Sequence, residues 1–268
     1  MSKFKTPLDY YLHCLSAKLS GFTVAVAELV SAPLPEDRKR LWILGSAASD
    51  YTAQQWKEDV LALGELQLPR HHLRGFFKLY GQKASQAEQG GQDSSKPSWQ
   101  LEQKYAASFS SSVEQAVNAG RLPKNFTPPP RHARPSLKWG AGLSPWAQAN
   151  CDVYHEILTQ MENDMIKEHG PLPRTPFPVA DIGQSTFRGA TSLSGLWGTM
   201  CTSSKLMRMD TWEILGGKGG LGVLGNNMTD KSVLGLSESE LSSLAGNAMA
   251  FTQLARVLLP VLAQYLSK

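Results

Sequence analysis

The sequence is poor in the residues that mark a secreted or metal-binding protein. It has only three cysteines in 268 residues, and Cys14, Cys151 and Cys201 stand far apart with no CxxC pair. Cysteines spaced in this way predict neither a disulfide framework nor a zinc site, and they suit a reducing compartment. The adjacent His71 and His72 point apart on a strand, or lie about 100° apart on a helix. We therefore expect free thiols and no metal.

A long uncharged hydrophobic run is also missing. The longest apolar stretch, Phe251 to Leu266, contains Arg256 and Gln264, and it is too short and too polar to span a bilayer. Residues Met1 to Asp9 are polar and charged, unlike a secretory signal. These absences predict a soluble intracellular protein with no membrane partner, nuclear in a eukaryote and cytoplasmic otherwise.

Charge of one sign is scarce as well. The formal net charge is only +4, which is compatible with nucleic-acid binding without requiring it. A hydrophobic share of 41% is enough to build a core. A chain of this length forms one large domain or two small ones.

The hydrophobic pattern predicts alternating helices and strands in the first part of the chain. Helical spacing runs from Leu8 to Leu19, and a later helix includes Trp56 and Val60 after a cap at Asp50 or Thr52. Strand patterns cover Gly21 to Val30 and Leu41 to Leu44. Residues Gln82 to Ser98, rich in Gln, Gly and Ser, predict a flexible insertion.

In the second part of the chain, the helices are predicted mainly from residues that favour helix starts. Helices are expected over Trp99–Val117 and from Pro145 to about His169, and a short strand over Val179–Ile182. Asp210 and Glu213 have the spacing of a helix start, and Ser237 with Glu240 forms a capping box. The last helix is expected to carry an apolar stripe, which comprises Leu254, Leu258, Leu262 and Leu266, widened by Val257, Val261 and Tyr265.

Two short motifs at opposite ends of the chain carry the functional information. Glu36, Arg38 and Arg40 precede the second strand, and the spacing of the arginines puts both guanidinium groups on one side of an extended segment. Guanidinium forks suit phosphate, carboxylate or a base edge. Taken alone, this run is a charged turn before a buried strand. The second motif is Gly246-Asn247-Ala248-Met249, which leads into the last apolar helix.

Together, and in this order, the two motifs resemble the C-terminal part of a cytosine-C5 DNA methyltransferase. Glu36, Arg38 and Arg40 fall on the marked positions of that family's Gln-x-Arg-x-Arg element, with Glu in place of Gln. Gly246 to Met249 match its final motif. The resemblance implies that Arg38 and Arg40 support catalysis at the flipped cytosine. It also implies that Gly246, Asn247 and Ala248 help to close a pocket for S-adenosyl-L-methionine.

The resemblance also implies a fold and a division of the chain. The fold is α/β, the C-terminal part of a Rossmann-like S-adenosylmethionine-dependent methyltransferase fold with an irregular, helix-containing target-recognition region. Residues 1–64 would be part of the catalytic domain, and residues 65–205 the target-recognition-like region with its flexible insertion. Residues 206–268 would return to the catalytic domain. Residues expected to bind double-stranded DNA lie in the middle region, and they are Arg131, Arg134, Lys138, Gln184 and Arg188.

The motifs that begin the reaction in this family are missing. Its Pro-Cys nucleophile, its Glu-Asn-Val acid and its Gly-rich cofactor turn precede the arginine element, and only about 35 residues do so here, too few to hold them. None of the cysteines follows a proline. Gly217 to Gly222 satisfies GxGxxG but is followed by another turn-rich segment, so we expect a flexible loop.

The sequence therefore predicts a DNA (cytosine-5-)-methyltransferase portion that is incomplete on its own. It would use S-adenosyl-L-methionine only when a polypeptide carrying the N-terminal catalytic half completes it. One alternative is a non-catalytic DNA- or RNA-binding module derived from the same scaffold. Another is an α/β interaction protein in which the motif matches are chance.

Overall fold

In the computed structural model, the chain forms two compact units. The first unit combines Met1–Arg70 with Met249–Lys268, and the second comprises His71–Ala248. The fold is mixed α and β, and the strand pairs within the described sheets are all antiparallel. The structure describes residues 5–18, 20–29, 34, 40–47, 50–65, 71–84, 98–139, 142–171, 175–198, 200–226, 235–248 and 250–266.

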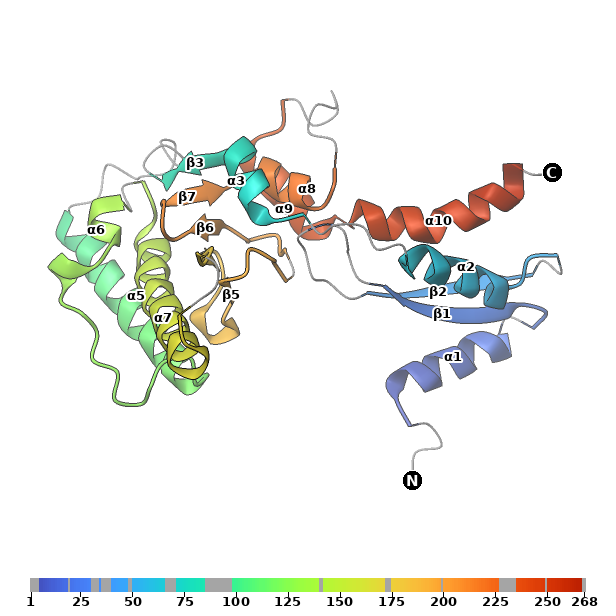
Figure 1. The fold of residues 1–268 in the computed structure, drawn as a ribbon, viewed down its shortest axis with the longest axis horizontal. Helices are drawn as coiled ribbons and strands as arrows, with labels where there is room; N and C mark the ends of the chain where they lie inside the picture. The colour runs from blue at the N-terminus through green and yellow to red at the C-terminus, as the bar shows by residue number, and fades with distance from the viewer. Residues whose placement is uncertain are drawn as a thin grey trace. The chain divides into compact units, whose positions relative to one another are not determined.

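The first unit is a β-hairpin covered by helices from both ends of the chain (Figure 1). Strand β1 pairs with β2 along its whole length, from Thr23 opposite Ser46 to Leu29 opposite Arg40. Every second residue at the end of β1 is buried, namely Ala25, Ala27 and Leu29. This alternation is expected for a strand with one covered face. The elements are α1 (Pro7–Lys18), β1 (Thr23–Leu29), β2 (Arg40–Ser46), α2 (Ala53–Glu65) and α10 (Phe251–Leu266).

Helix α2 links the hairpin to α10. Trp56 is fully buried and packs with Val60 and the inward-facing residues of β1. Its indole Nε1 donates to the carbonyl of Val257 at 3.0 Å, and the Gln253 amide donates to the carbonyl of Leu29 at 3.0 Å. The last helix is therefore an integral part of this unit, although about 200 residues separate it from α2 along the chain.

The second unit packs helices against a five-stranded antiparallel sheet with the order β3-β7-β6-β4-β5. Helix α7 begins at Pro145 after the N-cap Ser144 and stops at Gly170, whose φ of 77° favours glycine. The elements are α3 (Leu73–Tyr80), β3 (Gly81–Lys83), α5 (Ser98–Asn118), η1 (Arg131–Ala133), α6 (Ser136–Trp139), α7 (Pro145–His169), β4 (Val179–Asp181), η2 (Thr186–Arg188), β5 (Thr191–Ser192), β6 (Leu206–Arg208), β7 (Glu213–Leu215), α8 (Gly217–Val223) and α9 (Glu238–Asn247).

Most of the predicted elements are confirmed, and three expectations are wrong. The helix start expected at Asp210 is a turn between β6 and β7, because Asp210 pairs with Arg208 at 2.7 Å and Trp212 takes a φ of 58°. Gln82 and Lys83, expected in a flexible insertion, form β3, which pairs with β7. Residues 85–97 of that insertion lie outside the described residues.

The third correction concerns the glycine-rich segment. Residues Gly217 to Val223 form the buried helix α8 and not a flexible loop. Its glycines allow close packing, since a Cβ at Gly217 would overlap the backbone of α9 and a Cβ at Gly219 would overlap Leu215. Glycine is unfavourable inside a helix by about 1 kcal/mol relative to alanine. Here the close approach of neighbouring elements offsets that cost.

The division expected from the sequence differs from the observed units in one respect. Residues 206–248 were expected to return to the catalytic domain together with the last helix. They belong to the second unit, where β6 and β7 are central strands of the sheet. Only the segment from Met249 onward joins residues 1–70.

Candidate nucleic-acid interface

The two predicted catalytic arginines and the predicted cofactor motif fall in different units. Arg38, together with Glu36, lies outside the described residues. Arg40 is half-buried as the first residue of β2 in the first unit. Gly246 and Asn247 end α9 in the second unit, and Ala248 is the C-cap whose N–H donates to the Leu244 carbonyl. The next helix begins at Phe251.

Gly246 has a packing role that the motif does not reveal. A Cβ at this position would overlap the backbone of Cys201 and Thr202. The glycine therefore lets α9 lie directly against the loop that leads into β6. A requirement for glycine here follows from this contact alone, whatever the segment binds.

Residues 121–138, which hold Arg121, Lys124, Arg131, Arg134 and Lys138 around three prolines, are predicted from the sequence to form an extended basic loop that holds phosphates. In the structure, Arg131 and Arg134 stabilise this basic loop itself. The Arg131 guanidinium lies 3.7 Å from the centre of the Tyr105 ring and pairs with Glu102 at 3.0 Å. The Arg134 guanidinium lies 3.5 Å from the centre of the Phe109 ring, and its Nε donates to the Pro129 carbonyl at 2.9 Å. Such stacked and paired guanidinium groups fix a loop in place.

A buried carboxylate completes this arrangement. Asp152 of α7 is 1% exposed, and it accepts hydrogen bonds from the Tyr105 hydroxyl at 2.7 Å and from the N–H of Ser136 at 2.8 Å. The Ser136 hydroxyl donates to it at 2.5 Å, and Arg131 Nη1 lies 3.8 Å away. Of the three residues predicted in this loop to bind DNA, Arg131 and Arg134 are therefore held by the protein, whereas Lys138 on α6 is exposed.

Gln184 and Arg188, predicted from the same region, lie together on a turn that α5 and α7 support. The Asn150 amide of α7 donates to the main-chain carbonyl of Gln184 at 3.0 Å, and the Thr186 hydroxyl donates to the Ser112 carbonyl of α5 at 2.6 Å. Arg188 is exposed, and its Nη1 lies 3.5 Å from Gln184 Oε1. The turn thus presents a guanidinium group from a rigid base.

Arg121, the first basic residue of the predicted basic loop, joins the turn. Gly189 has a φ of 60°, and a Cβ there would overlap the Arg121 guanidinium. Arg121 therefore lies against the backbone one residue beyond Arg188. On the other side, the Gln184 amide donates to the Ser203 hydroxyl at 2.7 Å. Nothing in the spacing of Arg121, Gln184 and Ser203 along the chain predicts this cluster.

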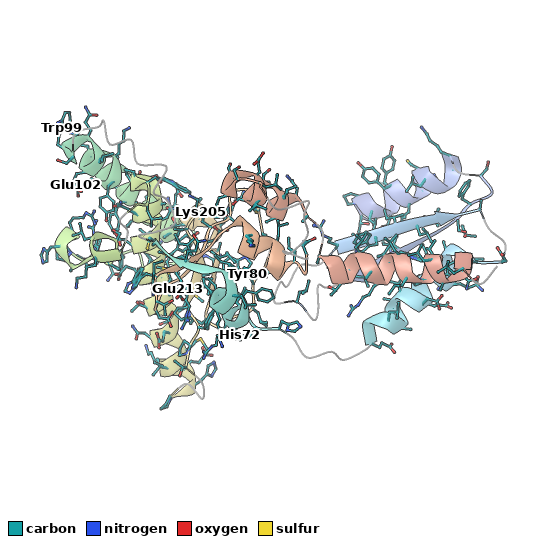
Figure 2. All side chains as sticks on the ribbon, turned by 90° about the horizontal axis from the view of Figure 1, so that it is seen from above. His72, Tyr80, Trp99, Glu102, Lys205 and Glu213 are labelled. Atoms are coloured by element: carbon teal, nitrogen blue, oxygen red, sulfur yellow. The ribbon has the colours of Figure 1, made fainter. Side chains whose placement is uncertain are left out.

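Ser203 also lines a polar cavity of about 480 Å³ at the ends of α3, α8 and α9. This volume is within the usual range for small-ligand sites. Two lysines and a group of hydroxyl side chains surround it, with Glu238 as the carboxylate. Lys205 and Tyr80, both labelled in Figure 2, are among the lining residues, which also include Thr202, Ser203, Ser204, Lys218, Glu238, Ser239 and Ser242.

The loop that carries Lys205 is shaped by Asp181, a buried residue at the end of β4. Its Oδ1 accepts the N–H of Lys205 at 2.7 Å and the N–H of Gly183 at 3.0 Å. Burial raises the pKa of Asp181, and hydrogen bonds from Ser204, Lys205 and Gly183 oppose that rise. Asp181 therefore fixes the backbone beneath the cavity.

The GxGxxG pattern does follow a strand and open a helix, as a nucleotide-binding turn would. However, the position that a phosphate would take at the start of α8 holds the Glu238 carboxylate, which accepts the N–H of Gly217. A Cβ at Gly216 would overlap the same carboxylate. The pattern therefore serves the packing of α8 on α9.

Among the described residues, neither the cysteines nor the side chains that could bind a metal form a further candidate site. Cys14, Cys151 and Cys201 are free, and burial raises the pKa of the Cys151 thiol well above its usual range. In the part of the chain that the structure describes, no group of three or more His, Cys, Asp or Glu side chains is placed to hold a metal ion. Among the same residues, no helix combines the length and hydropathy that crossing a bilayer requires.

Comparison with known proteins gives no match to the chain, either among family models or among curated protein sequences. The functional argument therefore rests on the geometry above and on the two sequence motifs.

Proposed function

We propose that this chain is the DNA-recognition and C-terminal part of a DNA (cytosine-5-)-methyltransferase. The observation that carries the proposal is the cluster of Arg121, Gln184 and Arg188, which adjoins the lysine- and hydroxyl-lined cavity through Ser203. The turn presents guanidinium groups and the adjoining cavity presents ammonium and hydroxyl groups, and groups of these kinds position DNA phosphates. The motifs at Arg40 and Gly246 supply the link to methyl transfer.

The proposal includes a methyltransferase-type α/β fold that is completed by a second polypeptide. Leu41 and Ile43 of β2 are 54% and 46% exposed, and α10 exposes Leu258, Leu259 and Leu262 at 44%, 53% and 51%. A two-stranded sheet is marginally stable by itself, and exposed apolar residues favour a partner. We propose that the partner carries the nucleophile, the acid and the Gly-rich turn, and that S-adenosyl-L-methionine binds only to the completed protein.

The alternative is a non-catalytic nucleic-acid-binding module on the same scaffold. The buried Cys151 fits both candidates, because a thiol with a raised pKa is a poor nucleophile at neutral pH and the first candidate places the nucleophile on the partner. Both candidates predict DNA binding, and only the first predicts methyl transfer after completion.

The first prediction concerns DNA binding. The full chain should bind duplex DNA with an affinity that falls steeply with salt, because each neutralised phosphate releases counterions. Arg188→Ala should weaken binding and reduce the slope of log K against log salt by about 1. Gel-shift titrations at several salt concentrations measure both quantities.

Lys104→Ala is the matched control, since it also removes one exposed positive charge, but from α5 at a distance along the helix from the cluster. It should leave the affinity and the slope nearly unchanged. Equal losses in the two variants would assign binding to overall charge. No binding at low salt would overturn both candidate functions.

The second prediction concerns chemistry. The chain alone should transfer no methyl group from S-adenosyl-L-methionine to DNA, because no positioned thiolate activates the cytosine ring. Adding an N-terminal half with the missing motifs should restore transfer, and Arg40→Ala should reduce it. Incorporation of tritiated methyl groups into DNA is the assay. Activity of the chain alone would contradict the proposal, whereas inactivity of the mixture with DNA binding intact would establish the non-catalytic module.

A further inference from the structure

A second, larger groove of about 1440 Å³ lies in the same unit, outside every residue singled out above for DNA binding. It exceeds the usual 300–1,000 Å³ of small-ligand pockets and is open along its length, so it suits an extended ligand. Its walls come from the first turns of α3, the end of α7 and the segments at 175–177 and 191–194. The lining residues are His71, His72, Arg74, Gly75, Lys78, Met161, Met165, Thr175, Pro176, Phe177, Thr191, Ser192, Leu193 and Ser194.

One wall of the groove is basic. Arg74 and Lys78 stand four residues apart on α3, so their side chains lie on the same face of the helix. Both residues are exposed. No carboxylate occurs among the described residues that line the groove, so its local charge is positive. This wall suits a row of negatively charged groups.

The remaining lining is apolar and hydroxyl-bearing. Met161 and Met165 lie one helical turn apart near the end of α7, and Met165 is 38% exposed. Methionine side chains are flexible and their thioethers are polarisable, so they adapt to neighbouring groups of different shape and make favourable contacts with aromatic rings. Thr191, Ser192 and Ser194 also line the groove, where the Thr191 hydroxyl donates to the Met161 sulfur at 3.5 Å and the Ser192 and Ser194 hydroxyls bond each other at 3.2 Å. The groove therefore combines cationic groups for phosphates with thioethers for the bases.

The basic wall is fixed to the hydroxyl wall by His72. Its Nδ1 accepts the N–H of Arg74 at 2.9 Å, and its ring hydrogen-bonds the backbone of Ser194. Desolvation, together with the Arg74 charge, lowers the pKa of His72, so the imidazole is neutral and keeps its acceptor at neutral pH. The N–H of Leu73 also donates to the Gly195 carbonyl at 3.0 Å. The groove is thus largely pre-formed, which reduces the ordering cost of binding.

Arg74 is supported from beneath by an aromatic ring. Its guanidinium lies 5.4 Å from the centre of the Phe177 ring, and His72 meets the same ring edge-on at 4.8 Å. Phe177 is only 1% exposed, so it supports Arg74 and is not itself a stacking surface for a ligand. The attraction between the guanidinium and the ring restrains the Arg74 side chain at the edge of the groove.

We propose that this groove binds a segment of single-stranded DNA, with Arg74 and Lys78 on the phosphates and Met161 and Met165 against the bases. A duplex presents its charged backbone outward and hides the faces of its bases, so only an unpaired strand uses both walls. Binding sites for single strands combine a positively charged groove with side chains that contact the bases, usually aromatic ones, and here Met161 and Met165 would take that place. The groove is separate from the Arg188 cluster, so this proposal goes beyond the proposed function, although the choice of DNA over RNA rests on that function.

The test uses the full chain and a fluorescently labelled oligodeoxythymidine of about 10 nucleotides, within the size range of single-strand sites. Fluorescence anisotropy gives the affinity as a function of salt. Arg74→Gln with Lys78→Ala should weaken binding about tenfold and reduce the salt slope by about 1.4, because each single-strand phosphate contact contributes about 0.7. Met165→Glu, at a position that is already partly exposed, should weaken binding because the introduced carboxylate repels the phosphates of the oligonucleotide.

Lys5→Ala with Lys18→Ala is the control, because it also removes two exposed charges but from the first unit, and it should leave oligonucleotide binding unchanged. Arg188→Ala should weaken duplex binding while sparing the oligonucleotide, which separates this proposal from the previous one. Unchanged binding in the Arg74 and Lys78 double variant would overturn the proposal. Competition by inorganic polyphosphate as strong as by unlabelled oligonucleotide would also overturn it, as would a clear preference for an RNA strand.

Discussion

Asp152→Ala should lower the free energy of unfolding of the second unit by about 3–5 kcal/mol, the usual loss when one partner of a buried charged network is removed. The carboxylate accepts hydrogen bonds from Tyr105 and twice from Ser136, and all three donors would lose their partner. Leaving buried donors unpaired costs more than the net value of the bonds. Urea unfolding, followed by the hydrogen exchange of α5 and α7 amides, measures the change.

Asp164→Ala is the matched control for this change. Asp164 lies on the same helix but is exposed, and it accepts a hydrogen bond from the Gln160 amide at 2.8 Å. Surface substitutions of this kind usually alter stability by no more than about 0.5 kcal/mol. A loss at Asp152 as small as that at Asp164 would mean that the network around Tyr105 adds nothing to the fold.

The aromatic contacts of the basic loop also affect how DNA binding is tested. Arg131 and Arg134 stack on the rings of Tyr105 and Phe109, so alanine at either position would disturb the loop as well as the charge. A weakened DNA affinity in those variants would not by itself identify a DNA contact. Arg188 and Lys138 are exposed and give a cleaner answer.

Trp56→Ala should destabilise the first unit by about 3–5 kcal/mol, the usual cost of truncating a large buried aromatic residue. The indole is fully buried between α2 and the hairpin, and its N–H donates to the Val257 carbonyl of α10. Its removal leaves a cavity and also frees the last helix. Hydrogen exchange should therefore accelerate in α2 and α10, while α7 in the second unit keeps its protection.

Two further variants make this result specific. Trp56→Phe keeps most of the apolar volume and loses the hydrogen bond, so it should cost less than the alanine variant. Trp99→Ala truncates a residue that is 59% exposed, and it should have little effect. Equal acceleration of exchange in α7 would contradict the separation of the chain into two units.

The local signals in the sequence were sufficient for elements whose ends are set by nearby residues. The helix from Pro145 to His169 was predicted with its boundaries, since Ser144, Pro145 and Gly170 act on the adjacent backbone. The capping box of Ser237 and Glu240 is also confirmed. Strand β1 and α2 follow from apolar patterning that matches their burial, whereas β2 forms as predicted but leaves Leu41 and Ile43 exposed.

Signals that depend on distant partners were misleading. Asp210 and Glu213 have the spacing of a helix start, but residues favoured at helix caps are also favoured in turns. Here Asp210 forms an ion pair with Arg208, and this pairing stabilises the turn. The glycines of α8 predict flexibility until the close contacts with α9 and Leu215 are known. The stripe of Leu258 and Leu262 is exposed, because the buried face of α10 carries Val257 and Val261.

The candidate site was predictable only in part. Gln184 and Arg188 were identified as polar groups at the end of a possible strand, and the structure places them on one turn. Their neighbours Arg121 and Ser203 come from segments far away in sequence, and no local pattern connects them. The basic loop was identified by its charge, which says nothing about the aromatic rings that take up Arg131 and Arg134.

The first unit is assembled from two segments that a ribosome makes far apart in time. At rates of roughly 5–20 residues per second, the ~180 residues of the second unit take about 10–35 s to synthesise after residue 70. Throughout that interval the hairpin and α2 lack α10, and the side of Trp56 that α10 covers is open to other chains. The second unit, whose sequence is continuous, is complete before α10 is made. We therefore expect nascent chains to need chaperones most over residues 1–70, the reverse of the usual order in which the segment made first folds first.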